Sequence, residues 1–460
     1  MTLEPTNYIK FKKVFYGLEP VKMVKENKWV AENIPALSVE PHMSHYSNYL
    51  TRFEMELNSV FYPGYLYREF ATSWQKVGER LLEFIDFGEV IKGCAFLNDK
   101  GKELEKSTLN DREKIYEAFR YIHENIKWNS IESAFVTKAY KENFLKNHSG
   151  NSAEVNLLLI ALLKKSGIEV EPVVLSTRDN GILNPSSASL RKINYVIGSV
   201  KINGETVLLD ATSPHSIPGV LPTRCLNVSG WVVHKTAGYW VDLNQGYGEI
   251  KKRFVRIYPD DNNQFFAEVS NTFEEYAYLD WVEKFEDEGS EEEYAKYFVV
   301  NSKNLGIENY SLKLNNTEDL KSIDIVSINI SNSDYVQDIG RELLLNPFVL
   351  NEIEENPFKS ESRKFPIDFI YPKHHSAVIS ISLPEGYSVN KLPNSHRMVT
   401  EGGTAKFELY YQLSSNMINI KYDLRINETI FPEDQYSIIK NFYGELLRII
   451  NQPIELNKKT

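Results

Sequence analysis

Apolar residues recur at helical spacing in three segments of the chain. A spacing of three or four residues places side chains on one face of a helix. The first segment, 72–86, begins at a Thr-Ser pair, the second follows Thr108, and the third follows Pro432 near the end of the chain. We expect helices there whose apolar faces carry Trp74, Val77, Leu81 and Phe84; Ile115, Phe119, Ile122 and Ile126; and Ile438, Phe442, Leu446 and Ile449.

A fourth helix is predicted between the Gly-Asn-Ser sequence at 150–152 and the Ser-Gly pair at 166–167. Small polar residues favour a helix start, and glycine favours a helix end. Residues 157–163 form an unbroken apolar run, so nearly every face of this helix is apolar. A helix of that kind is buried, and we therefore place it at the centre of its domain.

Alternation of apolar and polar residues predicts strands on both sides of this region. Apolar residues at 53, 55 and 57 alternate with charged ones, the pattern of a half-buried strand. Two apolar runs, 193–196 and 208–212, flank Asn203 and Gly204, the strongest short signal for a hairpin.

The hairpin turn also predicts which residues face one another. If residues 203 and 204 form a two-residue turn, Ile202 opposes Glu205 and Ile197 opposes Asp210. Tyr195 then lies on the same face as Asp210, as its diagonal neighbour. This register brings Tyr195 and Asp210 within reach of a hydrogen bond.

From about Trp240 the pattern changes to short strands. Apolar residues at 379, 381 and 383 alternate before the turn at 384–386. Ser290 and Glu293 form a capping-box signature for a helix that extends to Phe298. The acidic stretch 283–293 is interpreted as a solvated face, since it lacks the ligand spacing of an EF-hand.

Residues 105–240 resemble the core of the transglutaminase-like superfamily, in the form found in multidomain proteins of Bacteroidetes. There a helix opens with Gly-Asp-Cys-Lys-Asp, a His follows an Asn on a strand, and an Asp lies in Leu-Asp-Ala-Thr. In this chain Gly150 matches the glycine, Ser152 stands in the place of Cys, and Tyr195 stands in the place of His. Of the Cys-His-Asp triad, Asp210 alone is retained.

The resemblance extends to flanking segments. Residues 29–36 resemble the end of the β-sandwich that precedes such cores, although that domain is normally longer than the stretch present here. Residues 221–227 and 356–369 also resemble segments of these proteins. The resemblance implies an α+β fold with a papain-like core between β-sandwich-like domains: 1–70, the end of a β-sandwich; 71–245, the transglutaminase-like core; and 246–460, a β-rich region, as one domain or two subdomains, ending in a helix.

The two substitutions predict that the centre is inactive. A Cys thiolate is favoured at a helix N-terminus beside an imidazolium, whereas Ser is a weak nucleophile that needs an adjacent base. A tyrosine, with an ordinary pKa of about 10, does not act as a base near pH 7 as histidine does. We therefore expect a non-catalytic module that binds a protein, peptide or glycan through a vestigial cleft lined by Asn151, Ser152, Tyr195 and Asp210.

Three alternatives remain open at this point. A rewired hydrolase or acyltransferase could use Ser152 with His148 or His215 as its base, and a His within hydrogen-bond reach of Ser152 would favour it. A purely structural subunit would have its cleft filled by side chains. In the simplest interpretation, Ser152 is a helix cap and Tyr195 is a core aromatic residue.

Length and charge limit the remaining possibilities. A chain of 460 residues is expected to form two to four domains. A formal charge of −11 argues against a nucleic-acid partner, and no apolar run has transmembrane length. Residues 1–8 do not form a signal peptide. The resemblance nevertheless implies an exported, periplasmic or extracellular protein whose leader is not part of this sequence. The sequence leaves the oligomeric state open.

No cofactor or metal is expected. The histidines at 42 and 45 and the pair at 374 and 375 lack the further ligands at suitable spacing that a zinc site needs. Cys94 and Cys225 allow one disulfide at most. Cys225 lies in the segment that resembles the family, and we interpret both cysteines as inert.

Overall fold

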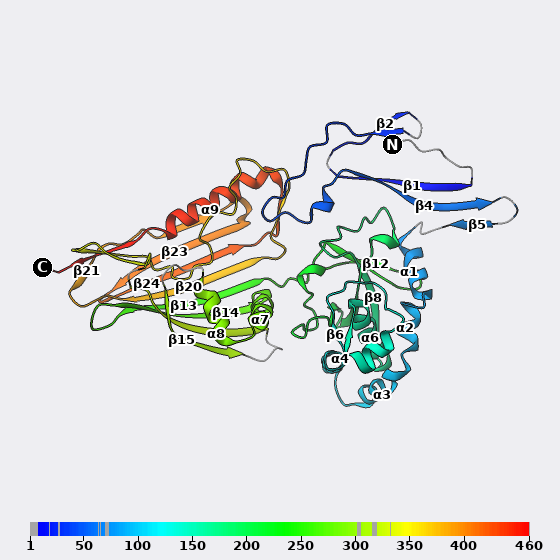
Figure 1. Cartoon of the computed structure of the whole chain (residues 1–460), viewed down its shortest axis with the longest axis horizontal. Helices are drawn as coiled ribbons and strands as arrows, with labels where there is room; N and C mark the ends of the chain where they lie inside the picture. Colours follow the sequence, from blue (N-terminus) through cyan, green and yellow to red (C-terminus); the bar gives the residue numbers. More distant parts are fainter. Residues whose placement is uncertain are drawn as a thin grey trace. The chain divides into compact units, whose positions relative to one another are not determined.

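The computed structural model describes residues 8–17, 19–25, 28–62, 64, 66–69, 73–300, 305–314, 320–331 and 333–459. The chain is a mixed α/β protein with a large share of sheet, and it divides into two compact units (Figure 1). Unit 1 comprises Met1–Val39 and Ser44–Gln245, and unit 2 comprises Glu40–Met43 and Gly246–Thr460. Within the described residues, no helix combines the length and the apolar composition needed to cross a bilayer.

Unit 1 begins with strands, as the alternation around residue 55 predicts. A three-stranded antiparallel sheet has the order β1-β4-β5, and a small hairpin joins β2 to β3. Phe53 of β4 stacks on Trp29 of β3, with ring centroids 5.0 Å apart. The sequence interpretation also covers residues 1–7 and 70–72, which lie outside the described part of the chain. The strands are β1 (Ile9–Tyr16), β2 (Lys22–Lys25), β3 (Lys28–Val30), β4 (Arg52–Tyr62) and β5 (Leu66–Glu69).

The predicted central helix is α6 (Ser152–Lys165), and every residue from Ser152 to Leu163 is buried. It packs on a five-stranded antiparallel sheet of order β10-β9-β8-β11-β12 (Figure 1). Gly198 of β9 permits the close approach, because a side chain there would meet Ile160 at 3.4 Å and Leu209 at 3.3 Å. The strands are β8 (Val170–Leu175), β9 (Tyr195–Ile202), β10 (Glu205–Leu209), β11 (Ser229–Val232) and β12 (Tyr239–Asp242).

Other helices lie around α6. Two of them begin close to where the apolar spacing predicts: α1 starts after the N-cap Ser73, and α4 starts after the N-cap Asn110. A short parallel pair, β6 and β7, leads into α6. The elements are α1 (Trp74–Glu83), α2 (Gly88–Gly93), α3 (Asn98–Lys106), α4 (Asp111–Asn125), α5 (Tyr140–Glu142), β6 (Lys127–Trp128) and β7 (Ser149–Gly150).

The hairpin has the predicted register. Asn203 and Gly204 both have positive φ angles, 53° and 86°, as a two-residue type I′ turn requires. Ile202 pairs with Glu205, and the antiparallel pairing continues to Gly198 and Leu209. The prediction of this hairpin is confirmed.

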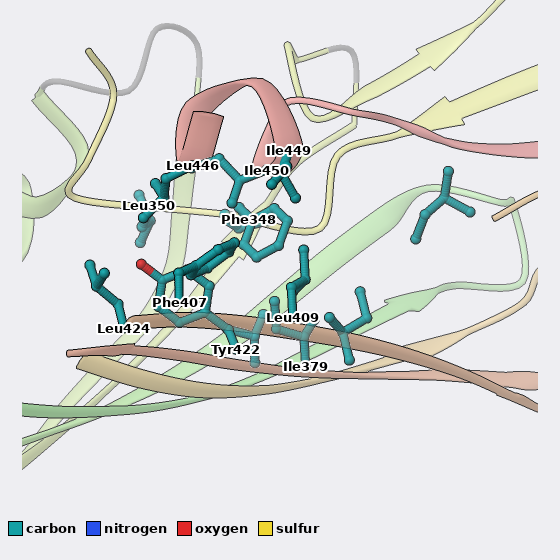
Figure 2. Packing of buried hydrophobic residues seen from close by; sticks show 14 of the residues in the cluster. Phe348, Leu350, Ile379, Phe407, Leu409, Tyr422, Leu424, Leu446, Ile449 and Ile450 are labelled. Atoms are coloured by element: carbon teal, nitrogen blue, oxygen red, sulfur yellow. The ribbon is translucent and has the colours of Figure 1, made fainter. Parts of the chain in front are cut away.

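Unit 2 is built on an eight-stranded sheet of order β15-β16-β14-β13-β20-β24-β23-β22, in which β13 and β20 run parallel. Apolar side chains of α9 (Tyr436–Ile450) and of residues 348–350 cover its central strands, and Figure 2 shows them packed against Phe407 and Tyr422. The strands are β13 (Glu249–Pro259), β14 (Phe265–Glu275), β15 (Gly306–Leu314), β16 (Lys321–Asn329), β20 (Lys373–Ser382), β22 (His396–Val399), β23 (Ala405–Ser414) and β24 (Met417–Ile426).

Smaller elements complete unit 2. A four-stranded sheet has the order β17-β18-β26-β21, and β19 pairs with β25. The predicted capping box of α8 is present in part, since Glu293 N donates to Ser290 Oγ at 3.2 Å. The elements are α7 (Tyr276–Glu288), α8 (Glu291–Val300), α9 (Tyr436–Ile450), β17 (Val336–Asp338), β18 (Glu342–Leu345), β19 (Ile367–Asp368), β21 (Tyr387–Lys391), β25 (Ile430–Phe431) and β26 (Ile454–Lys458).

Three details of the sequence interpretation are wrong in unit 2. Strands β13 and β14 have 11 residues each and are not short. Residues 276–288 form helix α7. The sequence interpretation did not predict this helix, because the acidic composition of 283–293 indicated only a solvated face. In α9, Ile438 is 42% exposed while Ile439 is fully buried, because both positions fit a stripe with Phe442 and the packing selects the second.

Candidate functional site

The N-terminus of α6 is closed by a capping box. Asn151 Oδ1 accepts a hydrogen bond from Glu154 N at 2.9 Å, and Glu154 Oε2 accepts one from Asn151 N at 3.2 Å. Gly150 is required just before it, because a side chain there would come within 2.4 Å of Glu154 Oε2. Asn151, a predicted cleft residue, is 6% exposed, and its Nδ2 donates to Phe135 O at 3.0 Å.

Ser152, the first residue of α6, is fully buried. Its Oγ donates to Ser133 O at 3.0 Å and accepts from Ser133 N at 2.9 Å, while its own backbone N donates to Ile131 O at 3.0 Å. The segment 131–135 therefore covers the helix start. Both hydrogen-bonding functions of the hydroxyl are used inside the protein.

Glu154 makes the same region rigid. Its buried carboxylate accepts hydrogen bonds from Thr137 N at 2.9 Å, Thr137 Oγ1 at 2.5 Å and Asn143 Nδ2 at 3.0 Å, in addition to the capping-box bond. A negative charge at a helix N-terminus is also favoured by the helix dipole. The helix start is thus tied to residues 131–143 by a fully satisfied polar network.

Tyr195 and Asp210 are both fully buried and lie in one network. Tyr195 Oη lies 3.1 Å from Thr212 Oγ1, which in turn donates to Asp210 Oδ1 at 2.5 Å. The predicted proximity of the two residues is therefore present, but the phenol reaches the carboxylate through Thr212. Burial raises the pKa of Tyr195 well above 10, and the negative charge of Asp210 raises it further.

Asn156 connects α6 to both strands of the hairpin. Its Nδ2 donates to Val196 O at 3.0 Å and to Asp210 Oδ2 at 3.2 Å, and its Oδ1 accepts from Ala211 N at 2.9 Å. Sequence reasoning did not select Asn156. Its signal in the sequence is an amide side chain directly before the apolar run 157–163. Such a group needs hydrogen-bond partners inside the protein when it is buried.

Arg224 is the second residue that the sequence analysis missed. Its guanidinium donates to Tyr195 Oη at 3.1 Å and also to Thr212 Oγ1. It lies 4.0 Å from the ring centroid of Trp128, a cation–π distance. The guanidinium also lies 5.6 Å from the ring centroid of Tyr195. Burial lowers the pKa of Arg224, but the nearby charge of Asp210 and the hydrogen bond to Tyr195 outweigh this and hold the pKa above the ordinary value.

The candidate bases for Ser152 have other environments. Within the described residues, the hydrogen bonds found for Ser152 Oγ go to Ser133 and to no histidine. His148 Nδ1 lies 2.8 Å from Asn125 O. His123 lies near Asp210 and His215, and burial lowers its pKa.

Both cysteines are buried free thiols. Burial raises the pKa of Cys94 to about 11 and that of Cys225 well above 9. Cys225 Sγ lies 3.9 Å from Asp210 Oδ2, inside the same network as Tyr195. Neither environment favours a thiolate, which is the reactive form.

Among the residues that the structure describes, no group of three or more His, Cys, Asp or Glu could hold a metal ion. The histidines considered at the sequence level have protein partners instead. His374 Nε2 lies 3.0 Å from Asp423 Oδ2, and His375 Nε2 lies 2.6 Å from Glu249 Oε1. His45 Nδ1 lies 2.8 Å from Ser47 Oγ.

Fold and site define a mixed α/β protein with a large share of sheet and a buried polar centre in unit 1. Over 97% of this chain and 70% of the other, the fold is similar to a protein from Parabacteroides distasonis ATCC 8503 described as a "putative protease", with a TM-score of 0.56 and 13% identity. Residues 341–456 match the model of a family described as a domain of unknown function with a solved structure, DUF3858. No curated protein matches the chain significantly.

Proposed function

We propose that this chain is a catalytically inactive transglutaminase-like protein that acts as a binding or scaffold module. The proposal takes unit 1 to contain a papain-like core in which Ser152, Tyr195 and Asp210 stand at the positions of the Cys-His-Asp triad. Two features support it: the helix start at residues 150–154, and the hairpin that carries Tyr195 and Asp210 into one buried network.

The environment of Ser152 is the single observation that carries the proposal. An attacking hydroxyl must reach an acyl carbon and give its proton to a base. Ser152 has no exposed surface, and its Oγ both donates to and accepts from the backbone of Ser133. A substrate could reach it only after segment 131–135 had moved away.

Tyr195 does not supply the missing base. General-base help contributes about 10²–10⁴-fold to such reactions, and it requires a group that can accept a proton near neutral pH. Here the phenol has a raised pKa and stays protonated. The guanidinium of Arg224 donates two of its hydrogen bonds to the phenol oxygen and to Thr212, so the nearest cation is also fixed in place.

A binding role therefore needs a different surface from the expected cleft. Asn151, Ser152, Tyr195 and Asp210 are all buried, so they support the core and do not line an open groove. Because side chains fill the centre of unit 1, these four residues fit the alternative of a purely structural role. Recognition of a protein, peptide or glycan is then assigned to other surfaces, and export remains a proposal that rests on the resemblance.

The test uses the purified full chain with a fluorophosphonate probe for reactive serines and iodoacetamide for reactive cysteines. We expect no labelling at Ser152, and labelling of Cys94 and Cys225 only after denaturation. Serine labelling that disappears in Ser152→Ala and persists in Ser186→Ala would establish the rewired hydrolase instead. Ser186 is a suitable control because it is an exposed serine of the same unit.

A further inference from the structure

Unit 2 contains a cavity of about 600 Å³ that the proposed function does not use. Its walls come from β13, β14, α7, α8 and the loop 350–355, elements that Figure 1 labels in part within unit 2. A cavity of this size is within the range that holds small ligands or single side chains of a partner. Its walls combine charged groups with aromatic rings, and these two features together indicate what it would bind.

Carboxylates outnumber cations in the lining. Asp280, Glu352, Glu354 and Glu355 face three basic residues. Two of the carboxylates have few partners within the described part of the chain. Asp280 accepts one hydrogen bond there, from Tyr371 Oη at 3.1 Å, and among the described residues no hydrogen bond or ion pair is found for Glu354.

The cations of the lining are occupied by internal partners. Lys251 lies 2.6 Å from Glu352 Oε2 and 3.3 Å from Glu249 Oε1. Arg253 donates from Nε to Asn271 Oδ1 at 2.7 Å and from Nη1 to Leu350 O at 2.5 Å. The third cation, Lys284, also interacts with other groups of the chain. The charge that remains available to a ligand is therefore negative.

Aromatic rings form the apolar part of the wall. The rings in the lining are Phe273, Trp281 and Tyr294. Trp281 stacks on Phe273 with a centroid distance of 6.1 Å, and Tyr294 meets Trp281 edge-on at 5.9 Å. Such rings offer contact to methylene groups, and aromatic rings also attract cations. Partial burial raises the pKa of Asp280, and the charge of Glu249 also raises it, while Lys251 and Lys373 lower it. A further cation bound beside this carboxylate would stabilise its ionised form.

We infer that this cavity binds an organic cation with an apolar stem, of the kind that a lysine or arginine side chain presents. The stem lies along the wall that Phe273, Trp281 and Tyr294 form, and the charged end binds between Asp280 and Glu354. This inference gives the proposed binding role a location in unit 2 and rests on that role for its biological meaning. It does not depend on whether Ser152 is reactive.

The test is titration calorimetry of the full chain with Nα-acetyl-lysine methylamide. Nα-acetyl-norleucine methylamide has the same kind of stem without the charge and serves as the matched control. We expect the lysine compound to bind more tightly, and added salt to weaken its binding. The peptide Gly-Gly-Lys-Gly-Gly tests whether the cation belongs to a polypeptide. Tighter binding of this peptide than of Nα-acetyl-lysine methylamide indicates a polypeptide partner, and equal binding indicates that the cavity recognises the side chain alone.

Variants locate the site. Asp280→Asn and Glu354→Gln should each weaken the lysine compound by about tenfold or more, as expected for loss of a charge-assisted hydrogen bond. Glu286→Gln removes a charge from α7 outside the cavity lining and should leave the affinity unchanged. Asp280 and Glu354 are both exposed, so both variants should fold.

Two results would overturn the inference: equal affinity for the lysine and norleucine compounds, including no measurable binding of either, or an unchanged affinity in Glu354→Gln. None of the varied residues belongs to unit 1. Failure here is therefore distinguishable from failure of the proposed inactivity, which the serine and cysteine probes report separately.

Discussion

Ser152→Ala separates a structural role of this serine from a catalytic one. The change removes the two hydrogen bonds between Ser152 Oγ and the backbone of Ser133, at 2.9 and 3.0 Å. Each such bond contributes about 1 kcal/mol net, and an unpaired backbone N–H at a partly buried position adds to the cost. We therefore expect unit 1 to lose about 2 kcal/mol of unfolding free energy.

Urea denaturation followed by tryptophan fluorescence suits this measurement. Five of the six tryptophans belong to unit 1, and Trp281 alone belongs to unit 2. The midpoint of the fluorescence transition should fall in Ser152→Ala with little change of its slope. Ser186→Ala, at an exposed serine of the same unit, should stay within about 0.5 kcal/mol of the parent chain.

A loss below about 0.5 kcal/mol in Ser152→Ala would refute the reasoning, because two buried hydrogen bonds cannot be removed at so small a cost unless the hydroxyl is free. Such a result would mean that segment 131–135 does not hold Ser152. The hydroxyl would then be accessible, and the rewired hydrolase would again need to be considered.

Three further predictions concern buried charges. Arg224→Met should destabilise unit 1 by about 3–5 kcal/mol in the same urea assay, since Asp210 would lose a nearby cation in the interior; a change below 1 kcal/mol would contradict the network. Glu154→Gln should lower the unfolding free energy by about 2 kcal/mol, because the new amide group would face hydrogen-bond donors. Glu113→Gln, in the exposed capping box of α4, should lower it by only about 0.3 kcal/mol. Burial raises the pKa of Asp324 to about 6, so the folded state holds this proton more tightly than the unfolded chain and stability falls as the pH rises from about 4 to 6. Asp324→Asn should gain up to about 3 kcal/mol relative to the parent chain over that range, and parallel pH profiles by circular dichroism would disprove this.

The elements that the sequence predicts well are those whose signals are local. The helix start is marked by the Gly-Asn-Ser sequence at 150–152, and the register of the hairpin follows from the turn at 203–204. These signals involve residues only a few positions apart, so a single sequence contains them. The burial of helix α6 could be predicted equally well, because its apolar run leaves no polar face for water to solvate.

The contacts that fill the centre of unit 1 are long-range, and the sequence could not specify them. Ser133 lies 19 residues before its partner Ser152, and Arg224 lies 29 residues after Tyr195. A guanidinium can pair with many groups, and nothing adjacent to Arg224 in the sequence indicates which it meets. The four residues that were expected to line a cleft are buried for this reason, since the groups that cover them come from two segments that the triad motif does not include.

Unit 2 shows the opposite limitation, in which a local signal pointed to the wrong feature. The acidic composition of 283–293 was correctly read as solvated, yet the same residues include the end of α7. The helix is held by its other face, where Tyr278, Trp281 and Val282 are buried. Aromatic residues at such spacing also suit strands, and only the packing against β14 decides between the two.

The presence of Asp210 is explained without any catalytic role. Its Oδ1 accepts hydrogen bonds from Thr212 N and Oγ1, and its Oδ2 accepts one from Asn156 on α6. The carboxylate thus joins the central helix to the end of β10, and replacing it would leave several buried donors unpaired, each at a cost of about 1–3 kcal/mol. These structural partners are sufficient to account for an aspartate at this position. Its presence beside Tyr195 is therefore no evidence for catalysis.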